Sequence, residues 1–70
     1  MVYIVIEIQS DEETASTIVN TYTNRNEAES KYHQILTSAS LSNVPVHTAV
    51  VMTDTGTILK CETYRHKVQE

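Results

Sequence analysis

Residues 2–8 read VYIVIEI and residues 44–52 read VPVHTAVVM, and these two apolar stretches flank the one amphipathic segment of the chain. Side chains that alternate with a period of two are typical of a β-strand. In the first strand, about residues 2–9, this period separates two sets of side chains: Val2, Ile4, Ile6 and Ile8 on one face, and Tyr3, Val5, Glu7 and Gln9 on the other. Because the first set is entirely aliphatic, we expect it to point at the helix.

Two further strands are less apolar than these. Residues 16–23 are rich in Thr, Val, Ile and Tyr, which suit a pleated surface, and their low apolar content indicates an edge strand. The last strand runs from about residue 57 to residue 64 or 65, and Lys60 and Glu62 share one of its faces. These charges discourage pairing with a further strand, so the last strand also belongs at an edge.

The start of the helix is the sharpest local signal. Asn24 is followed three positions later by Glu27, which is close to a capping box with Asn in place of Ser or Thr. We expect Asn24 to accept hydrogen bonds from exposed backbone amides and Glu27 to bond back to Asn24. Apolar side chains then recur at helical spacing and form one stripe: Ala28, Tyr32, Ile35, Leu36 and Ala39. The pattern weakens over residues 40–43, and Pro45 prevents helix beyond it.

These elements predict an α+β fold of the type ββαββ, with residues 1–70 as a single domain. The Asp-Thr-Gly sequence at residues 54–56 predicts a tight hairpin turn between the last two strands. The two most apolar strands belong in the centre, so we predict a four-stranded antiparallel sheet in the order 2-1-3-4. One helix covers one face of this sheet and leaves the other face to water or a partner.

The uncovered face is predicted to be a protein interface. In the third strand, the period of two separates Val46, Thr48, Val50 and Met52 from His47, Ala49, Val51 and Thr53. If the first of these sets faces the helix, the open patch consists of five residues: Tyr3, Val5, His47, Ala49 and Val51. Apolar patches on small proteins mark interaction surfaces, and a symmetric homodimer is the commonest outcome. The alternative interpretation is that these side chains serve strand propensity alone.

Length and composition narrow the class of protein. Seventy residues form only a small core, which disulfides, a metal or oligomerisation usually reinforce. The single cysteine, Cys61, excludes an internal disulfide, and oligomerisation remains by elimination. A net charge of −4, from five basic and nine acidic residues, argues against nucleic acid as a partner. The opening apolar run is too short to span a membrane and lacks the basic start of a signal peptide, so we expect a soluble cytoplasmic protein.

No catalytic, metal or cofactor site is predicted. Cys61 and His66 are five residues apart, which on a strand places them about 16 Å apart and on opposite faces, and Cys61 is expected to be a small core residue. His33, His47 and His66 are scattered over helix, strand and tail, whereas a metal needs at least three converging ligands. Whether His33 or His47 has a role beyond structure stays open.

Three segments in combination resemble small uncharacterised proteins of gut Firmicutes and of their phages or prophages: NRNEAESKYH at residues 24–33, SNVPVH at residues 42–47 and TDTG at residues 53–56. The resemblance spans nearly the whole chain. It implies a phage or prophage context, in which small oligomeric accessory and assembly proteins are frequent. It supplies no catalytic residues.

These observations favour a non-enzymatic protein-interaction or assembly module that self-associates through the uncovered sheet face. The alternative is a small regulatory module that binds another protein, by lending an edge strand or by covering an active site. An enzyme ranks third, because no acid, base and nucleophile converge by spacing.

Overall fold

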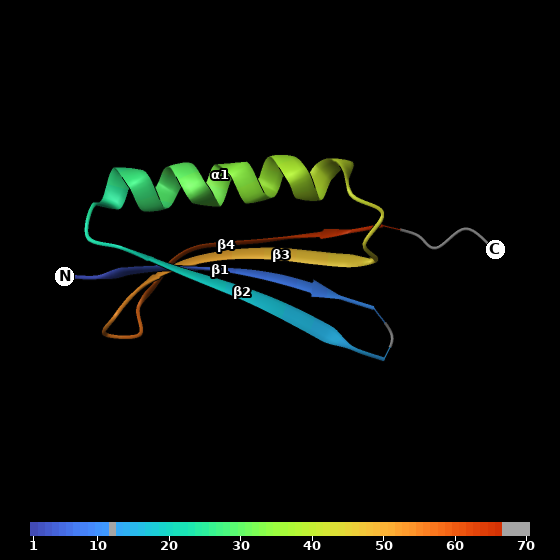
Figure 1. The fold of residues 1–70 in the computed structure, drawn as a ribbon, viewed down its shortest axis with the longest axis horizontal. Coiled ribbons are helices and arrows are strands. Elements are labelled where there is room, and N and C mark those ends of the chain that lie inside the picture. Colours follow the sequence, from blue (N-terminus) through green and yellow to red (C-terminus); the bar gives the residue numbers. More distant parts are fainter. Residues whose placement is uncertain (12, 67–70) are drawn as a thin grey trace.

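The computed structural model describes residues 1–11 and 13–66 of the chain. The elements are β1 (Tyr3–Ser10), β2 (Ala15–Tyr22), α1 (Arg25–Leu41), β3 (Val46–Thr53) and β4 (Ile58–Arg65). All three strand pairs are antiparallel, and the order across the sheet is β2-β1-β3-β4. Figure 1 shows α1 as a single layer along one face of the sheet. The predicted α+β fold and strand order are confirmed.

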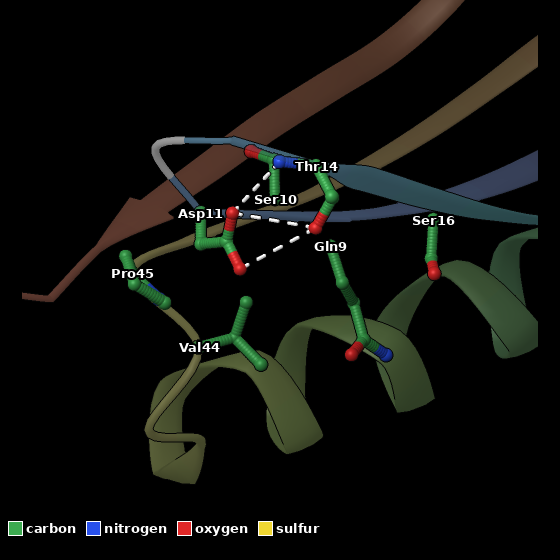
Figure 2. A pocket seen from close by; sticks show the side chains of 7 residues that line it. All are labelled: Gln9, Ser10, Asp11, Thr14, Ser16, Val44 and Pro45. Carbon is green, nitrogen blue, oxygen red and sulfur yellow. Dashed lines mark hydrogen bonds between the residues drawn. The ribbon is translucent and has the colours of Figure 1, made fainter.

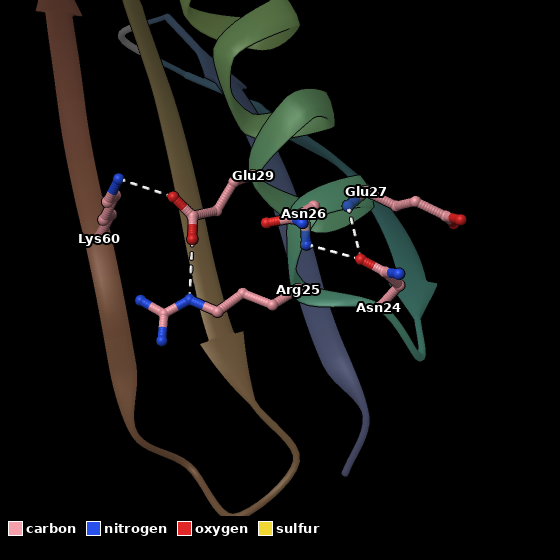
Figure 3. A network of polar contacts seen from close by, with 6 residues as sticks. All are labelled: Asn24, Arg25, Asn26, Glu27, Glu29 and Lys60. Carbon is pink, nitrogen blue, oxygen red and sulfur yellow. Dashed lines mark hydrogen bonds and ion pairs between the residues drawn. The ribbon is translucent and has the colours of Figure 1, made fainter.

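The helix begins where its capping residue predicts. The Oδ1 atom of Asn24 accepts hydrogen bonds from the backbone amides of Asn26 at 2.8 Å and Glu27 at 3.3 Å. These amides have no partner within the helix, and such a cap contributes about 1 kcal/mol. The reciprocal bond expected from Glu27 does not form, because its carboxylate is directed away from Asn24 (Figure 3). Only half of the expected capping box is therefore present.

The core is one layer of side chains between helix and sheet. Ala28, Tyr32, Ile35 and Ala39 are the buried residues of α1, and Leu36 packs against them, so the predicted apolar stripe is confirmed. The sheet contributes small and medium side chains, namely Val5, Ala49 and Val51, which have no exposed surface. Small sheet residues leave space for the ring of Tyr32.

The prediction that Ile4, Ile6 and Ile8 face the helix is wrong. Val5 is fully buried beneath α1, and its neighbours Ile4 and Ile6 must point to the opposite face of the pleated sheet. The alternation itself is as predicted, but it does not reveal which face the helix covers. The helix packs on the face with smaller side chains because Ala28 and Ala39 bring its backbone close to the sheet.

The β3–β4 hairpin combines the predicted turn with an unpredicted bulge. Gly56 has a φ of 92°, which disfavours other residues, and its amide donates to the carbonyl of Thr53 at 3.0 Å. Beyond the turn, Met52 pairs with Ile58 while Val51 pairs with Lys60, so Leu59 is an extra residue in β4. Leu59 packs against the core, and the strand resumes its alternation from Lys60.

Candidate functional site

The face of the sheet opposite α1 is the candidate site, and we call it the open face. Its residues are those of opposite alternation to the buried set: Ala15, Thr17, Val19 and Thr21 of β2; Ile4, Ile6, Ile8 and Ser10 of β1; Val46, Thr48, Val50 and Met52 of β3; Ile58, Cys61, Thr63 and Arg65 of β4. Among these residues the only charged side chain is that of Arg65, at one corner. The open face is therefore apolar or carries threonine over almost its whole width.

The strand register aligns the apolar side chains in rows across the sheet. Ile6 lies between Val19 on β2 and Val50 on β3, and Cys61 follows Val50 on β4. In a second row, Ile4 lies beside Met52, and Met52 beside Ile58. The bulge in β4 produces this last pairing, because it directs Ile58 to the open face.

Two of these side chains protrude strongly. Val19 is 57% exposed and Ile58 is 59% exposed, at opposite borders of the open face. Thr17, Thr48 and Thr63 form a more polar row together with Ile8, and in it the hydroxyls of Thr48 and Thr63 lie 3.0 Å apart across β3 and β4. The apolar rows thus lie toward the β3–β4 turn and the threonine row lies beyond them.

The predicted interface residues do not lie on the open face. Val5, Ala49 and Val51 have no exposed surface, His47 is 2% exposed, and Tyr3 packs against the core cluster. All five side chains therefore lie on the side of the sheet that α1 covers, and their assignment to an open patch is wrong. The error arises because the two faces of the sheet were assigned the wrong way round. The side chains predicted to face the helix are those that lie on the open face.

His47 and Glu7 form a pair between β3 and β1 on the covered side. His47 Nε2 lies 2.7 Å from Glu7 Oε2, which also accepts from Gln9 Nε2 at 3.0 Å. A carboxylate only accepts hydrogen bonds, so Nε2 of the imidazole is the donor. The other ring nitrogen, Nδ1, is buried and has no hydrogen-bond partner among the residues that the structure describes. The geometry gives His47 a structural role in fixing the β1–β3 contact beneath the end of the helix.

The remaining reactive side chains do not converge. Cys61 is exposed on the open face, so its prediction as a core residue is wrong. His66 Nε2 bonds to the carbonyl of Ala39 at 2.7 Å, whereas His33 is an exposed helix residue whose ring packs edgewise on Tyr32. Within residues 1–11 and 13–66, no three His, Cys, Asp or Glu side chains are grouped so that they could hold a metal ion. In the same residues no helix has the length and apolarity needed to cross a membrane.

A shallow polar hollow of about 230 Å³ lies beside the β1–β2 connection (Figure 2). Its walls come from the ends of β1 and β2 and from the segment before β3: Gln9, Ser10, Asp11, Thr14, Ser16, Val44 and Pro45. The carboxylate of Asp11 accepts from the backbone amides of Glu13 and Thr14, both at 2.8 Å, and these bonds lower the pKa of Asp11. The one acid in the wall is thus engaged in holding the turn, and we assign the hollow no ligand.

A charged cluster links the start of the helix to β4. Glu29 Oε2 accepts from Arg25 Nε at 2.8 Å, and Glu29 Oε1 accepts from Lys60 Nζ at 2.8 Å (Figure 3). The bond to Lys60, followed by that to Arg25, holds the pKa of Glu29 at about 2, below its ordinary value of 4.5. The spacing of Arg25 and Glu29 is readable from the sequence as an i,i+4 pair. The contact with Lys60 is not readable from the sequence, because only the fold brings Lys60 to the helix.

Glu29 should make the free energy of unfolding depend on pH. A carboxylate with a lowered pKa stabilises the fold above its unfolded pKa, and this contribution is lost as the pH falls from about 4.5 toward 2. We expect Glu29→Gln to lower stability at neutral pH and to match the wild type near pH 2. Urea unfolding over this range measures the difference. Glu27→Gln is the matched control, and an equal loss in both variants would contradict a specific role for Glu29.

The chain was compared with models of protein families, with curated proteins and with solved structures. The predicted resemblance to proteins of Firmicutes and their phages stays a prediction. None of the three comparisons finds a match to this chain.

Proposed function

We propose that this chain is a non-enzymatic assembly module that self-associates through the open face. The observation that carries the proposal is the nearly uncharged apolar surface on the side of the sheet that α1 leaves bare. Strands that face water on one side normally carry polar residues there. Here Ile4, Ile6, Ile8, Val50 and Met52 occupy the central two strands instead, and they are only partly covered by their neighbours.

The size of the open face supports a second copy as its occupant. Each strand has eight residues, so at about 3.3 Å per residue and about 4.8 Å between strands the face measures about 500 Å². Two copies packed face to face bury about 1,000 Å² in total, which reaches the lower limit of specific interfaces. Because the only charge among the residues of this face is that of Arg65 at one corner, the face can pack on itself without placing like charges together at its centre. A two-fold axis through the row of Ile6 and Val50 makes such a contact self-complementary.

The proposal includes a cytoplasmic location and a phage or prophage context. The thiol of Cys61 is exposed on the proposed interface. A reducing compartment keeps such a thiol from forming mixed disulfides. The alternative function is a regulatory module that binds another protein, by lending an edge strand or by covering an active site.

Sedimentation equilibrium in reducing buffer at micromolar concentrations tests the proposal. One chain has a mass of 7.9 kDa, and we expect a species of at least twice this mass. Cys61→Ser is the control that excludes a disulfide-linked dimer, and it should associate like the wild type. A mass of one chain throughout would reject self-association and leave the regulatory module.

A further inference from the structure

The two borders of the sheet differ in how they are protected. At one border, β4 carries Lys60, Glu62 and Arg65 and contains the bulge at Leu59, and both features discourage further strand pairing. At the other border, β2 reads ASTIVNTY and contains no charged residue, no proline and no bulge in its pairing with β1. An exposed edge of eight uncharged residues is a template for another strand.

The backbone groups available at this border can be identified from the hairpin. The amide of Asp11 donates to the carbonyl of Thr14 at 3.0 Å, so these two residues form a hydrogen-bonded pair. Such pairs alternate along an antiparallel ladder, and the even-numbered residues of β2 therefore bond to β1. The N–H and C=O groups of the odd-numbered residues point away from the sheet: Ala15, Thr17, Val19 and Thr21.

The helix does not shield this border. Ile18 lies on the covered side of the sheet, opposite Glu7 of β1, yet it is 52% exposed. Because α1 packs mainly on β3 and β1 and touches β2 less, it leaves the side chain of Ile18 largely uncovered (Figure 1). With Val19 also exposed on the other side, both faces of β2 present an apolar residue at the middle of the strand.

We propose that β2 pairs antiparallel with β2 of a second copy, about a two-fold axis perpendicular to the sheet, with Ile18 opposite Ile18 of the second copy. Residues directly opposite one another in a sheet point to the same face. The two-fold axis must therefore place one residue of β2 opposite the same residue of the second copy, and it cannot lie midway between two successive residues. Centred on Ile18, the register pairs Ala15 with Thr21 and Thr17 with Val19, and all four outward-pointing residues bond. Centred on Val19, it engages only three of them.

The edge contact and the open face can act together. A perpendicular two-fold axis places both helices on the same side of one eight-stranded sheet. The two open faces then become continuous, which doubles the apolar area available to further copies. The edge contact goes beyond the proposed face contact and does not depend on it, because it uses backbone groups and Ile18 on the covered side.

Disulfide trapping tests the edge contact and its register in the full chain. In the Cys61→Ser background, Ile18→Cys places two thiols across a pair whose Cα atoms are about 4.5 Å apart, a separation that a disulfide spans. Ser16→Cys is the matched control on the same face of β2, because the same register separates its two copies by about 13 Å along the strand. Mild oxidation should link Ile18→Cys at least about ten-fold more than Ser16→Cys. Equal linking of both variants, or none with Ile18→Cys, would overturn the register.

Charge exchange gives a second readout that needs no disulfide. Ile18→Lys and Ile18→Glu should each weaken the edge contact, because like charges then lie opposite one another. Mixing the two variants should restore it as a mixed dimer, seen by native mass spectrometry. The same experiments separate the edge contact from the open-face contact. If Ile18→Cys is trapped and Ile6→Lys leaves association unchanged, the edge contact alone is supported. If association is lost in Ile6→Lys and in neither charge variant of Ile18, the open-face contact alone is supported.

Discussion

Ile6→Lys is expected to abolish the face-to-face contact while the protein stays folded. Ile6 lies in the centre of the open face, between Val19 and Val50, and each copy in a face-to-face dimer brings one such side chain to the interface. Burying an ammonium group in this apolar surface without a partner costs at least about 2 kcal/mol per copy. Two copies together weaken face-to-face dimerisation by about 1,000-fold. Sedimentation over a concentration series measures this change.

Two controls separate loss of the interface from loss of the fold. Leu41→Lys adds the same charge at an exposed site at the end of α1, away from the open face, and should associate like the wild type. Ile6→Thr keeps a β-branched side chain and should weaken association less than lysine does. Circular dichroism should show the same secondary structure in all variants. If the wild type associates and Ile6→Lys associates as tightly, the open face is not the contact.

Tyr32→Ala is expected to remove about half of the free energy of unfolding of the protein. Tyr32 is 3% exposed and belongs to the core cluster with Val5, Ala49 and Val51. Removing a buried aromatic ring costs about 3–5 kcal/mol, through lost burial and the cavity left behind. A chain of this length has a total stability of only about 4–10 kcal/mol. Urea unfolding at fixed protein concentration measures the loss.

The neighbouring helix position provides the matched control for Tyr32. His33 is exposed, so His33→Ala should change the free energy of unfolding by less than about 0.5 kcal/mol. Tyr32→Phe keeps the ring and should retain most of the stability. If Tyr32→Ala unfolded at the same urea concentration as the wild type, the packing of α1 on the sheet would be wrong.

The order of the elements was predictable because each has a local cause. Asn24 caps the helix, Gly56 permits the turn, and the period of two defines the central strands. The strand order followed from the apolar content of these strands alone. These signals act over a few residues, so they are readable without knowledge of the fold.

The choice of face was not predictable from the same signals. The face of β1 that contains Ile6 is the more apolar one, and its composition predicts that it lies in the core. The covered set includes Glu7 and His47, which are tolerated there because they bond to each other across 40 positions of sequence. That pair forms only when β1 and β3 are in register. The contact between Lys60 and Glu29 is of the same kind, and it also escaped prediction.

The exposure of Cys61 follows from the same inversion. A lone cysteine on an apolar strand face is usually a core residue, and the composition of its own face therefore predicts that Cys61 is buried. Cys61 pairs with Val50 on the open face, so it is exposed together with the rest of that surface. One misassigned face thus accounts for both the wrong interface residues and the wrong cysteine.

The bulged, charged border of β4 has a consequence for the size that an assembly can reach. A chain whose two borders both accepted strands could add copies without limit and form a fibril. Here Leu59 interrupts the regular spacing of one border, and Lys60 is held at the helix by Glu29. If β2 pairs with β2 of a second copy as proposed, growth in the plane of the sheet therefore terminates after one addition and gives a finite particle.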